Sequence, residues 1–281
     1  MLESAFLCWT LPFIYLSPWS QRSSRRVLKI HIIISFSFML IYIYVRTTYG
    51  SNLRDLPKQV RSTSMREFTA NGCKMLVFEP ITTKKRRILL FPGLGISVRR
   101  MLQESCMDAF IEDSEIVCFQ VRGLGESDWN VDFSSKSMLE DALNAVSVFD
   151  LMTDCKLQTL FIGYSLGCFV SMQLLSHNCI TGVKCDNILL VNGMCSGKKM
   201  VSHFKLFASL LNLDVKRHVK NCNVPITVLH AQDDKTIPID EAIELKSECD
   251  SIGRHCKILT CDGDHNDYEL SDRTKAFLRK L

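Results

Sequence analysis

Residues 157–176 read LQTLFIGYSLGCFVSMQLLS, and this stretch decides the fold. It opens with a short apolar run typical of a buried strand and continues from Leu166 with a helical run. Between the two, Gly163-Tyr164-Ser165-Leu166-Gly167 matches the pattern G-x-S-x-G, in which a serine occupies a strained turn with its Oγ exposed beyond the sheet edge. A side chain at Gly163 or Gly167 would crowd that turn. The stretch therefore predicts a strand, a nucleophile elbow at Ser165 and a helix.

The sequence on both sides of this elbow alternates between predicted strands and predicted helices. Short apolar runs predict strands at residues 74–78, 87–91, 115–121, 157–162, 187–191, 226–230 and 257–260. Longer segments of helical periodicity predict helices at residues 98–110, 137–152, 166–176, 240–249 and 268–281. This alternation is typical of βαβ units, so we predict an α/β fold with a mostly parallel central sheet flanked by helices.

Two later loops carry the groups that a serine nucleophile needs. A serine hydroxyl requires a base, and the base requires an orienting carboxylate, in the chain order serine, acid, histidine. Asp233 and Asp234 follow the predicted strand 226–230, and His265 follows the predicted strand 257–260. Because the carboxyl ends of parallel strands meet at one edge of the sheet, both loops converge on the elbow. We interpret Ser165 as nucleophile, His265 as base and one of the two aspartates as the orienting acid.

Two backbone N–H groups are candidates for an oxyanion hole, which stabilises the negative charge that develops during acyl transfer. Leu166 directly follows the candidate nucleophile at the start of a predicted helix, and its N–H supplies one donor. The loop Pro92-Gly93-Leu94-Gly95 follows the predicted strand 87–91, and we assign the Leu94 N–H as the second donor. Residues 122–125 contain two further glycines and predict a tight turn with a structural role.

Charge and cysteine usage exclude several classes of function. The net charge is +4, from 34 basic and 30 acidic side chains, and the basic residues form no single stripe, which argues against a nucleic-acid-binding protein. The densest basic cluster, residues 84–87, precedes an apolar run and indicates a solvated turn. The 13 cysteines show neither a C-x-x-C pair nor a zinc-site spacing. We interpret them as reduced core residues and expect no metal and no cofactor.

The N-terminal 49 residues have the composition of a membrane anchor. Residues 27–45 are apolar apart from Lys29, His31 and two serines, and at about 1.5 Å per residue they span about 28 Å. We predict a single membrane span there rather than a buried helix, followed by a linker at residues 50–67. Basic residues flank the span on both sides, so the side of the membrane that holds the rest of the chain stays open.

A globular domain is predicted from residue 68 to residue 281. Within it, residues 194–223 lie between two predicted strands and carry several apolar side chains. This segment predicts either a small helical lid or an ordinary crossover helix with loops, because its length allows only one or two helices.

With these motifs in place, residues 68–281 resemble the α/β-hydrolase superfamily, and within it the membrane-anchored serine hydrolases related to monoglyceride lipases. Members of that family place the catalytic acid at the fifth position of a His-Gly-x-x-Asp loop. That position corresponds here to Asp234 and selects it over Asp233. Two features depart from the family: Pro92-Gly93 stands where His-Gly is usual, and the lid is shorter than in many lipases.

The resemblance implies an acylglycerol, a lysophospholipid, an acyl thioester or a small ester as substrate, cleaved through an acyl-enzyme on Ser165 without a metal or organic cofactor. The predicted membrane anchor favours a lipid carboxylic ester, of acylglycerol or lysophospholipid type, among these. The implied partners are this substrate and a membrane, with no nucleic acid. Two alternatives remain open, an acyl-protein thioesterase and a non-catalytic scaffold with the same fold. A peptidase would need a large cap domain or a site for an N-terminal amine, and the sequence shows neither.

Overall fold

The computed structural model of this chain describes residues 64–80, 82–122, 127, 134–177, 184–200, 205, 208–209 and 211–281. The predicted span at residues 27–45 and most of the predicted linker lie outside these ranges. In the ranges that the structure describes, no helix combines the length and hydropathy that a membrane crossing requires.

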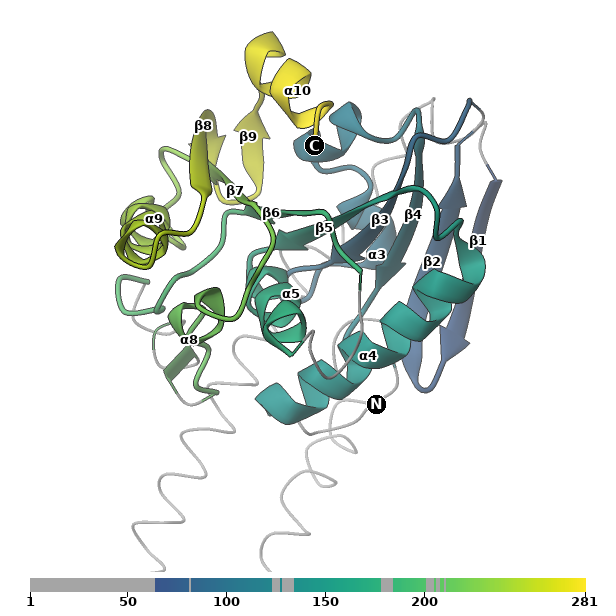
Figure 1. The fold of residues 1–281 in the computed structure, drawn as a ribbon, viewed down its shortest axis with the longest axis horizontal. Coiled ribbons are helices and arrows are strands. Elements are labelled where there is room, and N and C mark those ends of the chain that lie inside the picture. Colours follow the sequence, from purple (N-terminus) through teal and green to yellow (C-terminus); the bar gives the residue numbers. More distant parts are fainter. Residues whose placement is uncertain are drawn as a thin grey trace, which may run out of the picture. The chain divides into compact units, whose positions relative to one another are not determined.

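The strands of the described ranges form one sheet in the order β1-β2-β4-β3-β5-β6-β7-β8-β9 (Figure 1). They are β1 (Ser64–Ala70), β2 (Cys73–Glu79), β3 (Arg86–Phe91), β4 (Ser114–Phe119), β5 (Gln158–Tyr164), β6 (Asn187–Val191), β7 (Ile226–Ala231), β8 (Cys256–Asp264) and β9 (Asp267–Glu269). Pairing is parallel from β4 through β8 and antiparallel at the two ends, where β1, β2 and β9 lie. This topology confirms the predicted mostly parallel α/β sheet.

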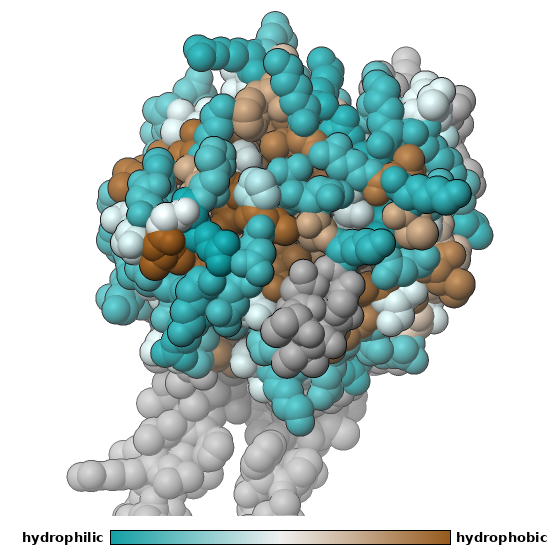
Figure 2. All heavy atoms as spheres, viewed as in Figure 1, coloured by the Kyte–Doolittle hydropathy of each residue, from teal (hydrophilic) through white to brown (hydrophobic). Residues whose placement is uncertain are grey.

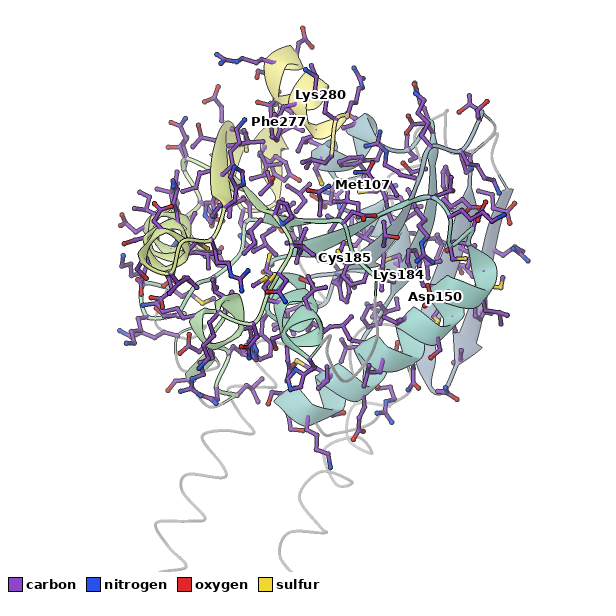
Figure 3. All side chains as sticks on the ribbon, viewed as in Figure 1. Met107, Asp150, Lys184, Cys185, Phe277 and Lys280 are labelled. Atoms are coloured by element: carbon purple, nitrogen blue, oxygen red, sulfur yellow. The ribbon has the colours of Figure 1, made fainter. Side chains whose placement is uncertain are left out.

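Helices cover both faces of the sheet (Figure 1). They are α3 (Val98–Met101), the 3₁₀ helix η2 (Ser105–Ala109), α4 (Ser135–Met152), α5 (Leu166–Ser176), α8 (Lys216–Val219), α9 (Asp240–Ser251) and α10 (Asp272–Leu278). Helices α4, α5 and α8 lie on one face, and η2 and α10 lie on the other. Figure 3 shows the same layering, with Met107 of η2 and Phe277 of α10 on one side of Cys185 and Asp150 of α4 on the other.

The core lies on both faces of the central strands. In β3, Ile88 and Leu90 belong to a buried cluster that includes Met107 and Phe110 at η2. The ring of Phe91, one residue further along, lies on the opposite face, with its centroid 5.4 Å from that of Phe161. Burial on both faces explains why these strands read as continuous apolar runs. Polar side chains cover most of the outer face that Figure 2 shows, with apolar side chains near its centre.

The predicted linker is wrong at its C-terminal end, because residues 64–67 belong to β1. This strand pairs antiparallel with β2 through a two-residue turn in which Asn71 (φ 51°) and Gly72 (φ 79°) both adopt positive φ. Asn-Gly is the sequence typical of such a hairpin turn. That dipeptide was the available signal, and the polar residues before it concealed the strand.

Two predicted helices are shorter than their apolar periodicity indicated. The segment 98–110 divides into α3 and η2, because Glu104 between them is extended (ψ 139°) and both parts point buried side chains into one core. The segment 268–281 begins as strand β9, which pairs with β8, and α10 starts only after Ser271. The Ser271 hydroxyl caps that helix by accepting a hydrogen bond from the Thr274 N–H at 3.2 Å.

The interpretation of residues 84–87 as a solvated turn holds for the two lysines and is wrong for the two arginines. Arg87 lies in β3 with only 1% of its surface exposed. Its guanidinium donates to Asp150 at 2.6 Å and to Thr159 at 2.9 Å, and it stacks 4.5 Å from the Phe149 ring centroid. Full pairing is what allows a charged side chain to be buried in this way.

The region predicted as a lid is described in part. It contains α8, which packs against α5 and α9. Glu241 of α9 fixes the beginning of the region, since its buried carboxylate accepts hydrogen bonds from the N–H groups of Cys195, Ser196, Gly197 and Lys199. Whether the remainder forms a helical lid stays a prediction.

Candidate active site

Ser165 occupies a strained turn between β5 and α5. Its backbone has φ 51° and ψ −113°, a conformation that non-glycine residues rarely adopt. The turn is held by hydrogen bonds from the Ser165 N–H to the Val191 carbonyl at 2.9 Å and from the Cys168 N–H to the Ser165 carbonyl at 3.1 Å. Ser165 is half-buried, so its hydroxyl stays within reach of a substrate.

The two glycines of the motif are required by close backbone contacts. A Cβ at Gly163 would lie 2.7 Å from the Gly167 carbonyl oxygen, and a Cβ at Gly167 would lie 1.9 Å from the Phe91 carbonyl oxygen. The Phe91 carbonyl belongs to β3 and the Gly167 carbonyl to α5, so neither can yield without disrupting packed secondary structure. The absence of a side chain at Gly163 and Gly167 therefore allows α5 to start directly against β3.

Ser165, His265 and Asp234 form one continuous hydrogen-bonded chain. The Nε2 atom of His265 lies 3.1 Å from the Ser165 Oγ, and its Nδ1 lies 2.6 Å from an Asp234 carboxylate oxygen. His265 and Asp234 are 7% and 5% exposed. The structure thus brings together three side chains from three loops at the carboxyl ends of β5, β7 and β8.

Asp234 is held rigidly by the loop that follows β7. Its second carboxylate oxygen accepts the N–H groups of Thr236 and Ile237, both at 2.8 Å. These two bonds aim the other oxygen at His265. Asp233, the competing aspartate, is exposed, and its N–H donates to the Gly263 carbonyl.

His265 lies in a two-residue turn between β8 and β9, where Asp264 pairs with Asp267. Its N–H donates to the Asp264 carboxylate at 2.7 Å, and the same oxygen accepts the Lys235 N–H at 3.1 Å. Asp264 thus connects the histidine turn to the loop that carries Asp234. Strand β9 was not predicted from the sequence, and neither was the tightness of this turn.

The loop assigned to the oxyanion hole lies directly against the nucleophile. A Cβ at Gly93 would approach the Ser165 Cβ to 3.2 Å, which places the Pro92-Gly93-Leu94-Gly95 loop beside the elbow. Gly95 has φ 73°, and the loop closes through the Ile96 N–H and the Gly93 carbonyl at 3.4 Å. Leu166 is the first residue of α5. Gly93, which precedes Leu94, and Leu166, which follows Ser165, therefore both lie next to the nucleophile, and the role of Leu94 and Leu166 as oxyanion donors stays a prediction.

A second buried histidine, His230, lies beside Asp234 without taking the place of His265. His230 Nε2 donates to the Ile237 carbonyl at 2.8 Å and lies 3.8 Å from the Asp234 carboxylate. Burial lowers the pKa of His230, which favours the neutral imidazole. The Asp234 carboxylate is consequently free to interact with His265. His230 stands at the first position of the five-residue loop pattern that ends at Asp234.

Two further residues at this site escaped sequence reasoning. Tyr164 and Asn192 are both buried, and both donate to the main-chain carbonyl of His265. Tyr164 stands inside the elbow motif, and Asn192 directly follows β6. Position at the carboxyl end of a central strand was the signal that could have found them. Within the described ranges, no group of three or more histidine, cysteine or acidic side chains is placed to hold a metal ion.

Solved structures of similar fold were found, while no protein family and no curated protein matches the chain by sequence. Est1E from Butyrivibrio proteoclasticus, solved with ferulic acid, matches with a TM-score of 0.59 and 13% identity, over 76% of this chain and 96% of that one. A thermostable carboxyl esterase from Bacillus coagulans, solved with glycerol, matches with a TM-score of 0.57 and 12% identity, over 78% and 94%.

A larger protein also shares this fold. An acylaminoacyl peptidase from Pyrococcus horikoshii matches with a TM-score of 0.58 and 16% identity over 74% of this chain. The match spans only 38% of the length of that peptidase. Together with the sheet order and the elbow, these similarities show that the described residues between 64 and 281 adopt the α/β-hydrolase fold.

Proposed function

We propose that this protein is a serine hydrolase that cleaves carboxylic esters, with Ser165 as nucleophile, His265 as general base and Asp234 as its orienting acid. The observation that carries the proposal is the hydrogen-bonded chain from Asp234 through His265 to Ser165, with distances of 2.6 and 3.1 Å. A buried acid, a histidine and a serine in this geometry activate a hydroxyl that is otherwise a weak nucleophile.

In the proposed reaction, the Ser165 Oγ forms a bond to the ester carbonyl carbon while His265 Nε2 takes the hydroxyl proton. Asp234 stabilises the resulting imidazolium through Nδ1–H. The N–H groups of Leu94 and Leu166 stabilise the oxyanion. The intermediate collapses, the C–O bond to the alcohol breaks, and His265 returns its proton to the leaving alkoxide. Water then attacks the acyl-enzyme by the same route and releases the carboxylic acid.

The substrate we propose is a lipid ester of acylglycerol or lysophospholipid type. Support comes from residues 27–45, whose length and apolar composition suit a single membrane span. A tethered active site meets the acyl lipids of its own bilayer at high local concentration. The same argument favours acylated membrane proteins, so a protein thioester is the second candidate substrate.

Labelling with a fluorophosphonate probe tests the catalytic proposal. We expect the detergent-solubilised wild-type protein to label and Ser165→Ala to lose all labelling. Ser171→Ala is the matched control, because Ser171 is also buried near the elbow, in α5, and donates only to the Cys168 carbonyl. A folded wild-type protein that stays unlabelled would favour the non-catalytic scaffold.

Hydrolysis assays in vesicles test the substrate class. Monoacylglycerol, lysophosphatidylcholine and an S-acylated peptide with the same acyl chain would be compared, each with wild type and with Ser165→Ala. We expect Ser165-dependent release of fatty acid from one of the two lipids. Release of fatty acid from the peptide alone would show that the substrate is a protein thioester and not a lipid ester.

Carbonate extraction of membranes from cells that express the full chain tests the predicted anchor. A spanning segment keeps the protein in the membrane pellet at high pH. Recovery in the supernatant would remove the argument for a lipophilic substrate and leave the catalytic proposal untouched.

A further inference from the structure

We propose that Tyr164 and Asn192 are positioning residues that hold the catalytic histidine turn in register with the nucleophile and the acid. They do so by donating two hydrogen bonds to a single acceptor, the main-chain carbonyl of His265. The proposal rests on the proposed function of Ser165, His265 and Asp234, and it assigns the two residues a role in the geometry of that site.

Both donors are buried and directed at the same oxygen. The Asn192 Nδ2 lies 2.7 Å from the His265 carbonyl oxygen, and the Tyr164 hydroxyl donates to it as well. Each donor is fully buried. Burial raises the pKa of the Tyr164 hydroxyl well above its usual value, so the phenol keeps the proton that it donates.

Asn192 is fixed to the strand that leads to the acid. Its Oδ1 accepts the Ala231 N–H at 2.8 Å, and its own N–H donates to the Leu229 carbonyl at 2.9 Å. Both partners belong to β7, which ends three residues before Asp234. Asn192 adopts φ 47°, a left-handed conformation that asparagine tolerates better than most residues. The Asn192 side chain therefore connects β7 to the histidine turn by hydrogen bonds and fixes one relative to the other.

Tyr164 makes the equivalent connection to the nucleophile. It directly precedes Ser165, and its ring centroid lies 5.7 Å from that of His265. Its hydroxyl also lies 3.1 Å from the side-chain oxygen of Asn266, the second residue of the turn. The side chain of Tyr164, which belongs to the elbow, thus contacts both residues of the turn.

The carbonyl that receives these bonds belongs to the peptide between His265 and Asn266. Fixing that peptide fixes ψ of His265, and with it the direction in which the imidazole leaves the backbone. The imidazole must reach Asp234 and Ser165 at once. A displacement of about 1 Å at such a site costs about 100-fold in rate. A short turn without these bonds would pivot about its two ends in β8 and β9.

If Tyr164 and Asn192 had a purely structural role, loss of their hydrogen bonds would have other effects than if they position the histidine. In the structural case the two bonds only satisfy buried polar groups, and their loss lowers stability without a specific loss of turnover. In the positioning case turnover falls while substrate binding and stability change little.

The test uses Tyr164→Phe, which removes one oxygen atom, and Asn192→Gly, which removes the side chain and adopts φ 47° without strain. Tyr268→Phe is the matched control. Tyr268 lies on β9 of the same hairpin and is buried, and within the described ranges its hydroxyl interacts with the Cys106 thiol and makes no hydrogen bond to the histidine turn. We expect kcat for ester hydrolysis to fall about 10-fold in each single variant and about 100-fold in the double variant, with KM unchanged. The melting temperature of Tyr164→Phe should match that of the control, whereas Asn192→Gly should melt lower, because it also leaves the buried Ala231 N–H without its acceptor.

Wild-type kcat in Tyr164→Phe and Asn192→Gly, or a loss of kcat that only follows a loss of melting temperature, would overturn the proposal. Proton NMR of the solubilised protein gives a reading independent of turnover, through the far-downfield signal of the Nδ1 proton that His265 shares with Asp234. Broadening of that signal in the double variant but not in Tyr268→Phe supports positioning even if no ester is hydrolysed. A sharp signal in both overturns it, whereas an unlabelled wild type contradicts only the proposed function.

Discussion

The elbow at Ser165 and the turn at His265 reach the same site by different means. The elbow is set by contacts between adjacent backbones, with a Cβ at Gly167 excluded at 1.9 Å from the Phe91 carbonyl. The turn is set by two side chains from distant segments, Tyr164 and Asn192, together with the adjacent Asp264, which also accepts the Lys235 N–H. Local sterics determine the first region, and tertiary hydrogen bonds determine the second.

Because of this difference, substitutions in the two regions should have different effects on stability and on turnover. The elbow cannot change without disturbing the packing of α5 against β3, so its glycines belong to the fold as much as to the site. The turn can lose a partner and keep its strands, because β8 also pairs with β7 along six residues. Substitutions at the elbow should therefore affect stability first, and substitutions around the turn should affect turnover first.

The largest effect is expected at the acid that contacts the turn. Asp234→Asn should lower kcat about 10⁴-fold, because an amide stabilises the wrong tautomer of the catalytic histidine. Asp233→Asn, one residue away and exposed, should leave kcat nearly unchanged. Steady-state kinetics on one ester would compare the two. Equal losses in both variants would mean that Asp234 is not the orienting acid. Turnover would then no longer distinguish the turn at His265 from the elbow.

The next effect concerns the elbow and is measured as stability. Gly167→Ala should lower the free energy of unfolding by more than about 3 kcal/mol, since the added methyl group meets a rigid backbone carbonyl. Gly253→Ala is the control, because Gly253 has φ 70° and open space around it, so the alanine adds only backbone strain of about 1 kcal/mol. Urea unfolding would measure both. If Gly167→Ala lowered the free energy of unfolding no more than Gly253→Ala, steric exclusion at the elbow would be contradicted.

The smallest effect is a pH dependence next to the histidine turn. Glu104 precedes η2, which is joined to β9 by a hydrogen bond from the Ser105 hydroxyl to the Tyr268 carbonyl at 2.8 Å. The carboxyl group is buried, and its partner Arg100 lies 3.6 Å away. Burial raises the pKa of Glu104 from 4.5 to about 7, an effect that Arg100 opposes and Asp267 reinforces. Between these two values the folded protein keeps a proton that the unfolded chain has lost, so stability falls as pH rises through this window.

Glu104→Gln should therefore be about 2 kcal/mol more stable than wild type at pH 8 and equal to it at pH 4. Glu269→Gln provides the control, because Glu269 is exposed on β9. Chemical unfolding at the two pH values would measure the difference. A gain of equal size at both pH values would show that packing, and not ionisation, separates the variant from wild type.

Prediction from sequence succeeded where one local rule decides the structure. Strand β6 and helix α5 have the predicted bounds, because each is a continuous apolar run between clear breaks. It failed at β9 and at the break between α3 and η2, where partners distant in the sequence override helical periodicity. Asp234 was chosen over Asp233 by family resemblance, and adjacent residues of equal chemistry differ only in which one the fold directs inward.

The sequence alone determined the alternation of elements, the elbow, and the residue types and order of the candidate triad, because these follow from hydrophobic period, glycine sterics and the chemistry of an activated serine. The tertiary structure decided which carboxylate contacts His265, that His230 lies buried beneath it, and that Tyr164 and Asn192 meet at one carbonyl. Such contacts join atoms up to 101 residues apart, as between Tyr164 and His265. They exist only once the strands have paired, because register fixes which side chains share an edge.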